Sequence, residues 1–221
     1  FNARGEMNTK WGWVGGEYKL WDDRLRIVAG IAANKFNYPD TTYLSYQFAA
    51  TYKAGENNLF RFVASRAPRS STIFDTYVNQ DVVFYPIGRK KYLHVTLNGS
   101  KDQELLTADM LELGYRGNIS KRLNVEVELF SIKARNFNDL VGQQPFMTLR
   151  GEDTIMNLRI KSDNISLKSF QKGITIALSY NTAKLQVKPF VTIQESLKQD
   201  YDSFSVADGP QPAVYKVNGK K

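Results

Sequence analysis

One pattern constrains the fold of this chain more than any other feature, a series of repeated hairpins. Segments in which apolar and polar residues alternate are separated by tight turns, and an aromatic residue often precedes the turn. The turns lie near 21–24, 54–57, 118–121 and 181–184, and the aromatic residues are Tyr18, Tyr52, Tyr115 and Tyr180. Alternation with a period of two places successive side chains on opposite faces of a sheet. The chain is therefore expected to be all-β.

Eight long strands follow from this pattern, at 11–20, 24–35, 43–54, 58–66, 108–118, 123–136, 172–181 and 185–198. The third strand shows the alternation most clearly. Leu44, Tyr46 and Phe48 point to one face, whereas the intervening Ser45 and Gln47 point to the other. The same division recurs in most of the other strands. One face suits lipid, and the other suits a wet lumen.

The connections between these strands differ greatly in length. Residues 67–107 and 137–171 are long loops, and 199–221 is an unfinished loop. Short strand patterns occur inside the first two, at 92–97 and 154–160. Short turns at one end, long loops at the other and an aromatic girdle are typical of outer-membrane β-barrels. We interpret residues 1–221 as an antiparallel up-and-down transmembrane β-barrel segment, about eight strands of a larger barrel, with the long loops on the extracellular side.

The cost of placing charge in lipid adds to this interpretation. An Arg or Lys that faces lipid at mid-bilayer costs about 2–4 kcal/mol. The charged side chains of the strands are therefore expected to face the lumen. Pro189 interrupts the last strand, where it is tolerable at a bulge or at an unpaired edge.

Composition excludes several classes of protein. With 42% hydrophobic and 24% charged residues, the chain is too apolar for a disordered segment, and it has no apolar run long enough for a spanning helix. It has no cysteine, so a disulfide framework and a thiolate metal site are excluded. The net charge is +8, but the basic residues are scattered and form no nucleic-acid signature. Arg89, Lys90 and Lys91 are interpreted as a solvated loop edge that could face anionic lipid.

Both ends of the sequence suggest a segment of a longer mature chain. The first residues, Phe1 to Arg4, lack a starting Met and the apolar core of a signal peptide. The last residues, Val217 to Lys221, are polar and have the composition of a loop.

Two stretches resemble TonB-dependent outer-membrane receptors. In the first, Phe62 to Pro68 contains an Arg-Ala-Pro tripeptide and is followed by a short aromatic turn, Ile73 to Tyr77. In the second, Asn98-Gly99-Ser100-Lys101 leads through 105–108 into Glu-Leu-Gly-Tyr at 112–115, and a hairpin follows with its second strand at 123–130. The family has Pro-Glu before this strand, whereas this sequence has Glu104-Leu105, so the loop entry differs.

The resemblance implies an internal part of a barrel that has 22 strands in that family. The sequence contains neither a plug domain, nor a TonB-box-like segment, nor a terminal aromatic strand. The function implied is that of an outer-membrane active-transport receptor. Its extracellular loops would capture a scarce solute, and a plug outside this segment would let the solute pass with energy delivered through TonB. The implied partners are the lipid bilayer of the outer membrane, the plug, TonB and an unknown solute, with no cofactor and no nucleic acid.

Candidate ligand-binding residues are expected in the long loops, because exposed aromatic and arginine side chains often anchor binding. The candidates are Arg66, Arg69, Phe74, Tyr77 and Phe146. For Arg66, the alternatives are contact with the ligand or plug, or a lumen-facing side chain bonded to its neighbours. For the aromatic residues, the alternative is packing of the loops against each other.

A lumen charge group is expected on the hairpin that contains Glu112, Arg116, Glu126 and Glu128. With the turn centred near Ser120, Arg116 would lie diagonally from Glu126, within reach of it. The group would hold a plug, line a path for solute, or pair within the wall.

Catalytic and metal sites find little support. His94 is the only histidine, so a Ser-His-Asp triad would have to use it and an imidazole metal site would lack a second ligand. Asn138 with Asp139, and Asp200 with Asp202, offer oxygen ligands but do not form an EF-hand pattern. We assign no enzyme activity and no metal. The alternative class is a soluble or cell-surface β-sheet ligand-binding module, in which the apolar faces would pack in a core; an integral outer-membrane enzyme comes third.

Overall fold

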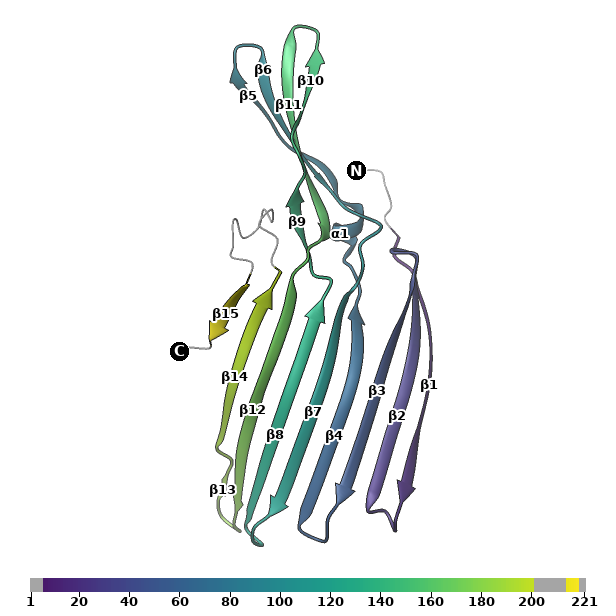
Figure 1. The fold of residues 1–221 in the computed structure, drawn as a ribbon, viewed down its shortest axis with the longest axis vertical. Helices are drawn as coiled ribbons and strands as arrows, with labels where there is room; N and C mark the ends of the chain where they lie inside the picture. The colour runs from purple at the N-terminus through teal and green to yellow at the C-terminus, as the bar shows by residue number, and fades with distance from the viewer. Residues whose placement is uncertain (1–5, 201–213, 219–221) are drawn as a thin grey trace.

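The computed structural model describes residues 6–200 and 214–218, which form two sheets (Figure 1). The larger sheet has ten strands. Along the sheet lie β1 (Thr9–Leu20), β2 (Leu25–Phe36), β3 (Thr42–Lys53), β4 (Asn58–Arg69), β7 (Leu106–Asn118), β8 (Leu123–Arg135), β12 (Lys168–Asn181), β14 (Phe190–Gln199) and β15 (Val214–Asn218), with β13 (Gln186–Val187) beside β12. Every pairing in this sheet is antiparallel. The up-and-down arrangement expected from the sequence is confirmed.

All eight expected strands are present, with ends shifted by at most four residues. The last of them is divided at Pro189 into β13 and β14, which keep a continuous register against β12. The Pro189 carbonyl still accepts a hydrogen bond from the Leu178 amide at 3.0 Å. Among the described residues, β15 pairs with β14 only from Glu195 to Gln199, so the other edge is unpaired at Pro189. The proline therefore lies at an unpaired edge, one of the two expected positions. Residues 201–213 of the unfinished loop, including Asp202, lie outside the described part.

The short turns all lie at one end of the large sheet, shown at the bottom of Figure 1. In the β1–β2 turn, the Arg24 amide donates to the Trp21 carbonyl at 3.1 Å. Trp21, Asp22 and Asp23 have positive φ values of 54°, 52° and 63°. Gly55 reaches a φ of 76° in the β3–β4 turn, where it adopts a conformation that costs other residues more.

Cross-strand pairing divides the side chains of this sheet between two faces. A row on the face that we call the apolar face crosses eight strands through Tyr18, Ile27, Ala50, Phe62, Leu113, Leu129, Ile174 and Ile193. The adjacent row on the polar face contains Lys19, Arg26, Thr51, Arg61, Gly114, Glu128, Thr175 and Thr192. The alternation expected from the sequence is therefore maintained across the width of the sheet.

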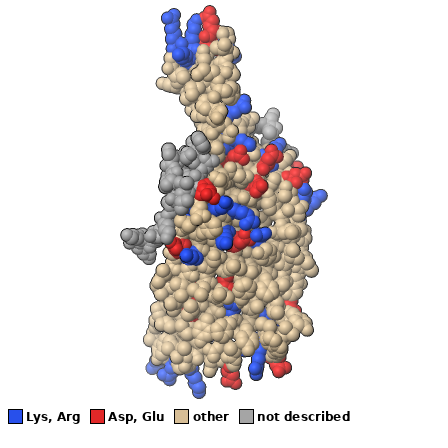
Figure 2. Space-filling model, viewed as in Figure 1, with Lys and Arg blue, Asp and Glu red and all other residues tan. Residues whose placement is uncertain are grey.

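The apolar face is left exposed in the structure. Leu44 is 57% exposed, Leu111 54% and Ile193 67%. Figure 2 shows a broad band with few charged residues between charges at the lower tips and a band of mixed charge near the upper ends of the strands. Aromatic residues on the apolar face gather beside the turns, among them Tyr18, Tyr52, Phe60, Tyr115 and Tyr180. These include all four tyrosines on which the expected girdle rested.

The two long loops combine into a second sheet, which we call the loop sheet. Its strands are β10 (Phe146–Arg150), β11 (Asp153–Asn164), β6 (Lys91–Asn98) and β5 (Asn79–Gly88) in that order, with β9 (Asn138–Gly142) also beside β11. β6 comes from one loop and β11 from the other, and the two pair in parallel. The short strands expected at 92–97 and 154–160 are therefore present, and they join the loops to each other. In Figure 1 the loop sheet projects beyond the upper ends of the long strands.

The most closely packed part of the molecule is the junction between the two sheets. The short helix α1 (Ile73–Tyr77) begins with a capping box in which Thr72 and Asp75 exchange hydrogen bonds. Asp75 also accepts a hydrogen bond from Ser162 of β11 at 3.2 Å. Ser162, Gln103 and Leu105 are each 1% exposed. Side chains from both loops thus fix the loop sheet to the strands below it.

No helix in the described segments is long and apolar enough to cross a membrane.

We expect Gly99→Ala to loosen this junction. A Cβ at Gly99 would lie 2.6 Å from the Thr76 carbonyl carbon and 2.8 Å from the Asp75 oxygen, which are backbone atoms that cannot move aside alone. Overpacking of this kind costs about 1–3 kcal/mol. Hydrogen exchange should show faster exchange at β6 and β11 amides in this variant. Gly88→Ala, at the end of β5 in the loop sheet, meets only Lys91 side-chain atoms at 3.8 Å and should leave the exchange unchanged. Equal exchange in the two variants would contradict the tight junction.

Candidate functional site

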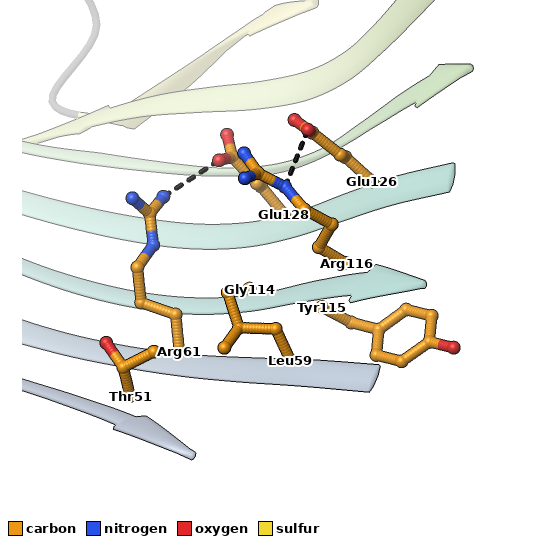
Figure 3. A pocket seen from close by; sticks show the side chains of 8 residues that line it. All are labelled: Thr51, Leu59, Arg61, Gly114, Tyr115, Arg116, Glu126 and Glu128. Atoms are coloured by element: carbon orange, nitrogen blue, oxygen red, sulfur yellow. Dashed lines mark hydrogen bonds and ion pairs between the residues drawn. The ribbon is translucent and has the colours of Figure 1, made fainter. Parts of the chain in front are cut away.

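A group of charged side chains lies on the polar face, toward the short turns (Figure 3). Arg61 of β4 bonds to Glu112 of β7, and its Nη2 donates to Glu128 Oε1 of β8 at 2.8 Å. Arg116 Nε lies 2.7 Å from Glu126 Oε1. The four residues of the expected charge group therefore lie in two neighbouring sets on this face, because Arg61, which the sequence did not single out, bonds to Glu112 and Glu128, whereas Arg116 pairs with Glu126.

Strand register explains the geometry of the group. Arg116 is directly opposite Glu126 in the β7–β8 pairing, so the diagonal placement expected from the sequence is wrong. Arg61 reaches Glu128 across β7 because the residue between them in the row is Gly114. With no side chain at Gly114, the arginine can lie over that strand. An added Cβ there would be 3.4 Å from Arg61 Cβ and Nε.

Sequence reasoning missed Arg61 because its partner strand follows the first long loop. The β4–β7 pairing joins residues about fifty positions apart, and the hairpin pattern does not indicate their register. Arg61 alternates along β4 with Phe60 and Phe62, which point to the apolar face. This alternation is the signal in the sequence that could have predicted a polar-face position for Arg61.

The expected ligand-binding residues lie in different places. Phe146 of β10 is in the loop sheet, where the Arg159 guanidinium lies 4.7 Å from its ring centroid. Phe74 on α1 is 51% exposed. Arg69 ends β4, at a polar-face position. Tyr77 packs at the junction, with its ring 5.6 Å from the Tyr38 ring. The packing alternative therefore describes Tyr77.

Arg66 is on the apolar face, in register with Tyr46, and not on the lumen-facing side considered from the sequence. Its Nε and Nη2 donate to the two carboxylate oxygens of Asp109 at 2.5 and 3.2 Å. Arg135 donates to the same carboxylate at 2.9 Å. Arg66 is thus bonded to its neighbours, as the alternative reading proposed, but on the opposite face. The physical reason is strand parity, because Arg66 follows Phe62 and Ala64 at intervals of two.

One face of the loop sheet combines aromatic rings with hydrogen-bonding groups, and we call it the ring face. It consists of Phe84, Tyr92, His94, Phe146, Asn157 and Arg159. Phe84 stacks on Tyr92 with ring centroids 5.3 Å apart. This surface could stack against a planar group and hydrogen-bond to its polar atoms.

His94 belongs to this ring face and has polar partners on both sides. Its Nε2 is 2.8 Å from Asp81 Oδ1, and its Nδ1 is 3.2 Å from Asn157 Oδ1. No hydroxyl group among the described residues hydrogen-bonds to the ring, so the triad arrangement is not formed there. The described residues also contain no group of three or more metal-ligating side chains. Asp139, one of the oxygen ligands considered from the sequence, lies in β9 and pairs in register with Asp163 of β11.

We expect Arg61→Met to destabilise the sheet more than Arg116→Met does. Loss of Arg61 leaves two carboxylates, Glu112 and Glu128, without their shared cation, whereas loss of Arg116 leaves only Glu126. Exposed ion pairs contribute about 0.2–1 kcal/mol each, so the difference should be roughly 1 kcal/mol or less. Denaturant titration of both variants measures it. Adding Glu128→Gln should recover part of the loss in Arg61→Met, and an absence of recovery would contradict the shared role of Arg61.

Comparison with known proteins gives matches at the level of the fold. No family model and no curated protein matches the sequence. The siderophore receptor PirA from Acinetobacter baumannii aligns with a TM-score of 0.60 at 13% identity, over 95% of this chain and 30% of that one. The FrpB iron transporter from Neisseria meningitidis aligns with a TM-score of 0.62 at 11% identity, over 90% and 27%. The outer membrane transporter YddB from Escherichia coli aligns with a TM-score of 0.60 at 9% identity, over 87% and 25%.

This chain therefore spans 30% or less of the length of these three proteins. By their names they are receptors and transporters. Their similarity to this chain agrees with the open, up-and-down sheet and with the sequence resemblance. The chain has the fold of part of the β-barrel of TonB-dependent outer-membrane receptors.

Proposed function

We propose that this chain forms part of the barrel of an outer-membrane receptor that captures a scarce solute and imports it with energy from TonB. The observation that supports the proposal most is the apolar band on one face of the ten-stranded sheet, with charged residues at both of its ends. Outward apolar bands flanked by aromatic girdles are the mark of membrane-spanning barrels. The chain is a transport component and not an enzyme in this proposal.

The exposed apolar side chains argue against the soluble alternative. A soluble module would bury Leu44, Leu111, Leu113 and Ile193 in a core, because soluble monomers rarely expose apolar patches larger than a few hundred Å². In the described part of the chain no layer packs over this face, and these four side chains are each more than half exposed. Lipid provides the missing contact. In the pairing of the described residues, β1 and β15 each have one unpaired edge, which further strands of a larger barrel would fill.

The two ends of the wall would have different tasks. The loop sheet is on the extracellular side in this proposal, and its ring face offers Phe146, Arg159 and the Phe84–Tyr92 stack to a solute. The polar face would line the lumen. There, Arg61 with Glu112 and Glu128 would contact a plug supplied by another part of the receptor. Similar receptors bear names that mention siderophores and iron, which makes an iron complex the first solute to test.

Charge placed on the apolar face should destabilise the barrel in a bilayer. Phe48 is on the apolar face and Gln47 on the polar face of β3, one residue apart. Phe48→Arg should lower the free energy of unfolding in bilayers by up to about 2–4 kcal/mol, the cost at mid-bilayer, because an arginine would face hydrocarbon. Gln47→Arg should have a much smaller effect. Equal effects of the two substitutions would refute the assignment of lipid and lumen faces.

Solute affinity should depend on the loop end of the wall and not on the turn end. Phe146→Ala removes the ring under Arg159, and Phe74→Ala removes an exposed ring on α1. Tyr77→Ala should also weaken binding, by loosening the junction below the loop sheet. In the intact receptor, these changes should reduce affinity for the imported solute, measured by equilibrium binding. Asn57→Ala and Thr182→Ala, in the short turns, should leave it unchanged. The reverse pattern would place the extracellular side at the wrong end.

A further inference from the structure

Four charged residues lie together on the apolar face, close to the loop end, and we call them the rim cluster. They are Arg66 of β4, Asp109 of β7, and Lys133 and Arg135 of β8. Arg66, Asp109 and Lys133 are consecutive in one cross-strand row, which continues to Phe170 of β12. Figure 2 shows a band of mixed charge near the upper ends of the strands, which is the end where the four residues lie in β4, β7 and β8.

The rim cluster marks the boundary of the apolar band. Two rows nearer the turns, the same strands present Phe62, Leu113 and Leu129. On β8, Leu123 to Lys133 covers the about 9–11 residues that a tilted strand needs to cross the hydrocarbon. The cluster's own row adds aromatic rings, Tyr46 and Phe170, which are typical of the interface with lipid headgroups.

The rim cluster has more positive than negative charge. Asp109 accepts hydrogen bonds from both Arg66 and Arg135, so two guanidinium groups share one carboxylate. Lys133 is exposed, and its ammonium lies 5.9 Å from the centroid of the Phe170 ring. Within the described residues, no carboxylate is within ion-pair distance of Lys133. Three cations therefore face one anion.

Two neighbouring lysines on β12 differ from the cluster because each has a carboxylate partner. Lys172 lies 3.4 Å from Glu195, and Lys168 lies 3.0 Å from Asp200. Among these residues, the unbalanced positive charge therefore lies in the rim cluster. Its side chains supply a planar guanidinium fork and a mobile ammonium, which are the groups that bind phosphate oxygens in proteins.

We propose that the rim cluster binds the phosphorylated headgroup of a membrane lipid in the leaflet at the loop end. The proposal rests on the lipid-facing assignment of the apolar face given above. The acyl chains would lie along the apolar band below Ala64, Leu111 and Ser131, and the phosphate would accept hydrogen bonds from Lys133 and Arg135. Basic groups at a membrane surface attract anionic headgroups, and this attraction weakens as salt rises.

Native mass spectrometry of the intact receptor with bound phosphatidic acid tests the proposal, and phosphatidylcholine with the same acyl chains serves as the reference lipid. We expect the receptor to retain phosphatidic acid in preference to phosphatidylcholine. Lys133→Gln with Arg135→Gln should reduce that retention about tenfold. Lys133→Gln alone leaves the Asp109 hydrogen bonds intact and should give a smaller reduction without affecting folding.

The matched control removes the same charge from the other end of the same hairpin. Lys121 and Arg122 lie in the β7–β8 turn. The double substitution Lys121→Gln with Arg122→Gln should leave the retention of phosphatidic acid unchanged. An equal loss in this control, or equal retention of the two lipids, would refute the rim site. Displacement of the lipid by equimolar inorganic phosphate would also refute it, by showing a site for the free ion. Phe48→Arg and Gln47→Arg could differ in stability as expected while the receptor shows no preference for phosphatidic acid. That result would overturn only the rim proposal, and the membrane assignment would stand.

Discussion

The hydrogen-bonded register between neighbouring strands is the constraint on which the rest of this structure depends. In hydrocarbon, every backbone N–H and C=O must be paired within the protein, and a sheet meets this need through its ladders. The same ladders determine which side chains share a face. A slip of one residue would move a strand's polar residues into the apolar row that contains Leu113 and Leu129, and would separate Arg61 from Glu128. Backbone pairing, the separation of the apolar and polar faces, and the ion pair between Arg61 and Glu128 therefore require the same alignment.

Beyond the long strands, the two ends of the wall are built differently. The turn end is closed by tight turns, in which Gly55 and the residues after Leu20 adopt positive φ values. The loop end contains the parallel β6–β11 pair, and hydrogen bonds such as Gln103 to Ser162, at 2.8 Å, connect its two loops. Loops ordered in this way can hold binding groups in fixed positions, which is what capture of a dilute solute requires.

Local pattern was enough to predict the strands, their faces and the end at which the turns lie, because each depends on residues close in sequence. The partner strands across the long loops were not predictable in this way, so Arg61 and the parallel pairing of β6 with β11 emerged only from the structure. β5 also lacked a clear signal, since its pairing with β6 shifts register at Asp81 and Pro86. The position of Arg66 was available from strand parity but conflicted with the expectation that charge faces the lumen. That expectation applies at mid-bilayer and ends where the strand reaches the interface.

The claim central to this account is that alternate residues of one strand face lipid and lumen. The chain has no cysteine, so single spin labels can be placed from Gln47 to Thr51 on β3, on the turn side of the rim cluster, in a cysteine-free parent receptor. Collision rates with oxygen, which concentrates in lipid, and with a water-soluble nickel complex should be measured in bilayers. The account predicts high oxygen accessibility at 48 and 50 and high nickel accessibility at 47, 49 and 51. A profile without alternation, or one dominated by nickel at every position, would contradict it.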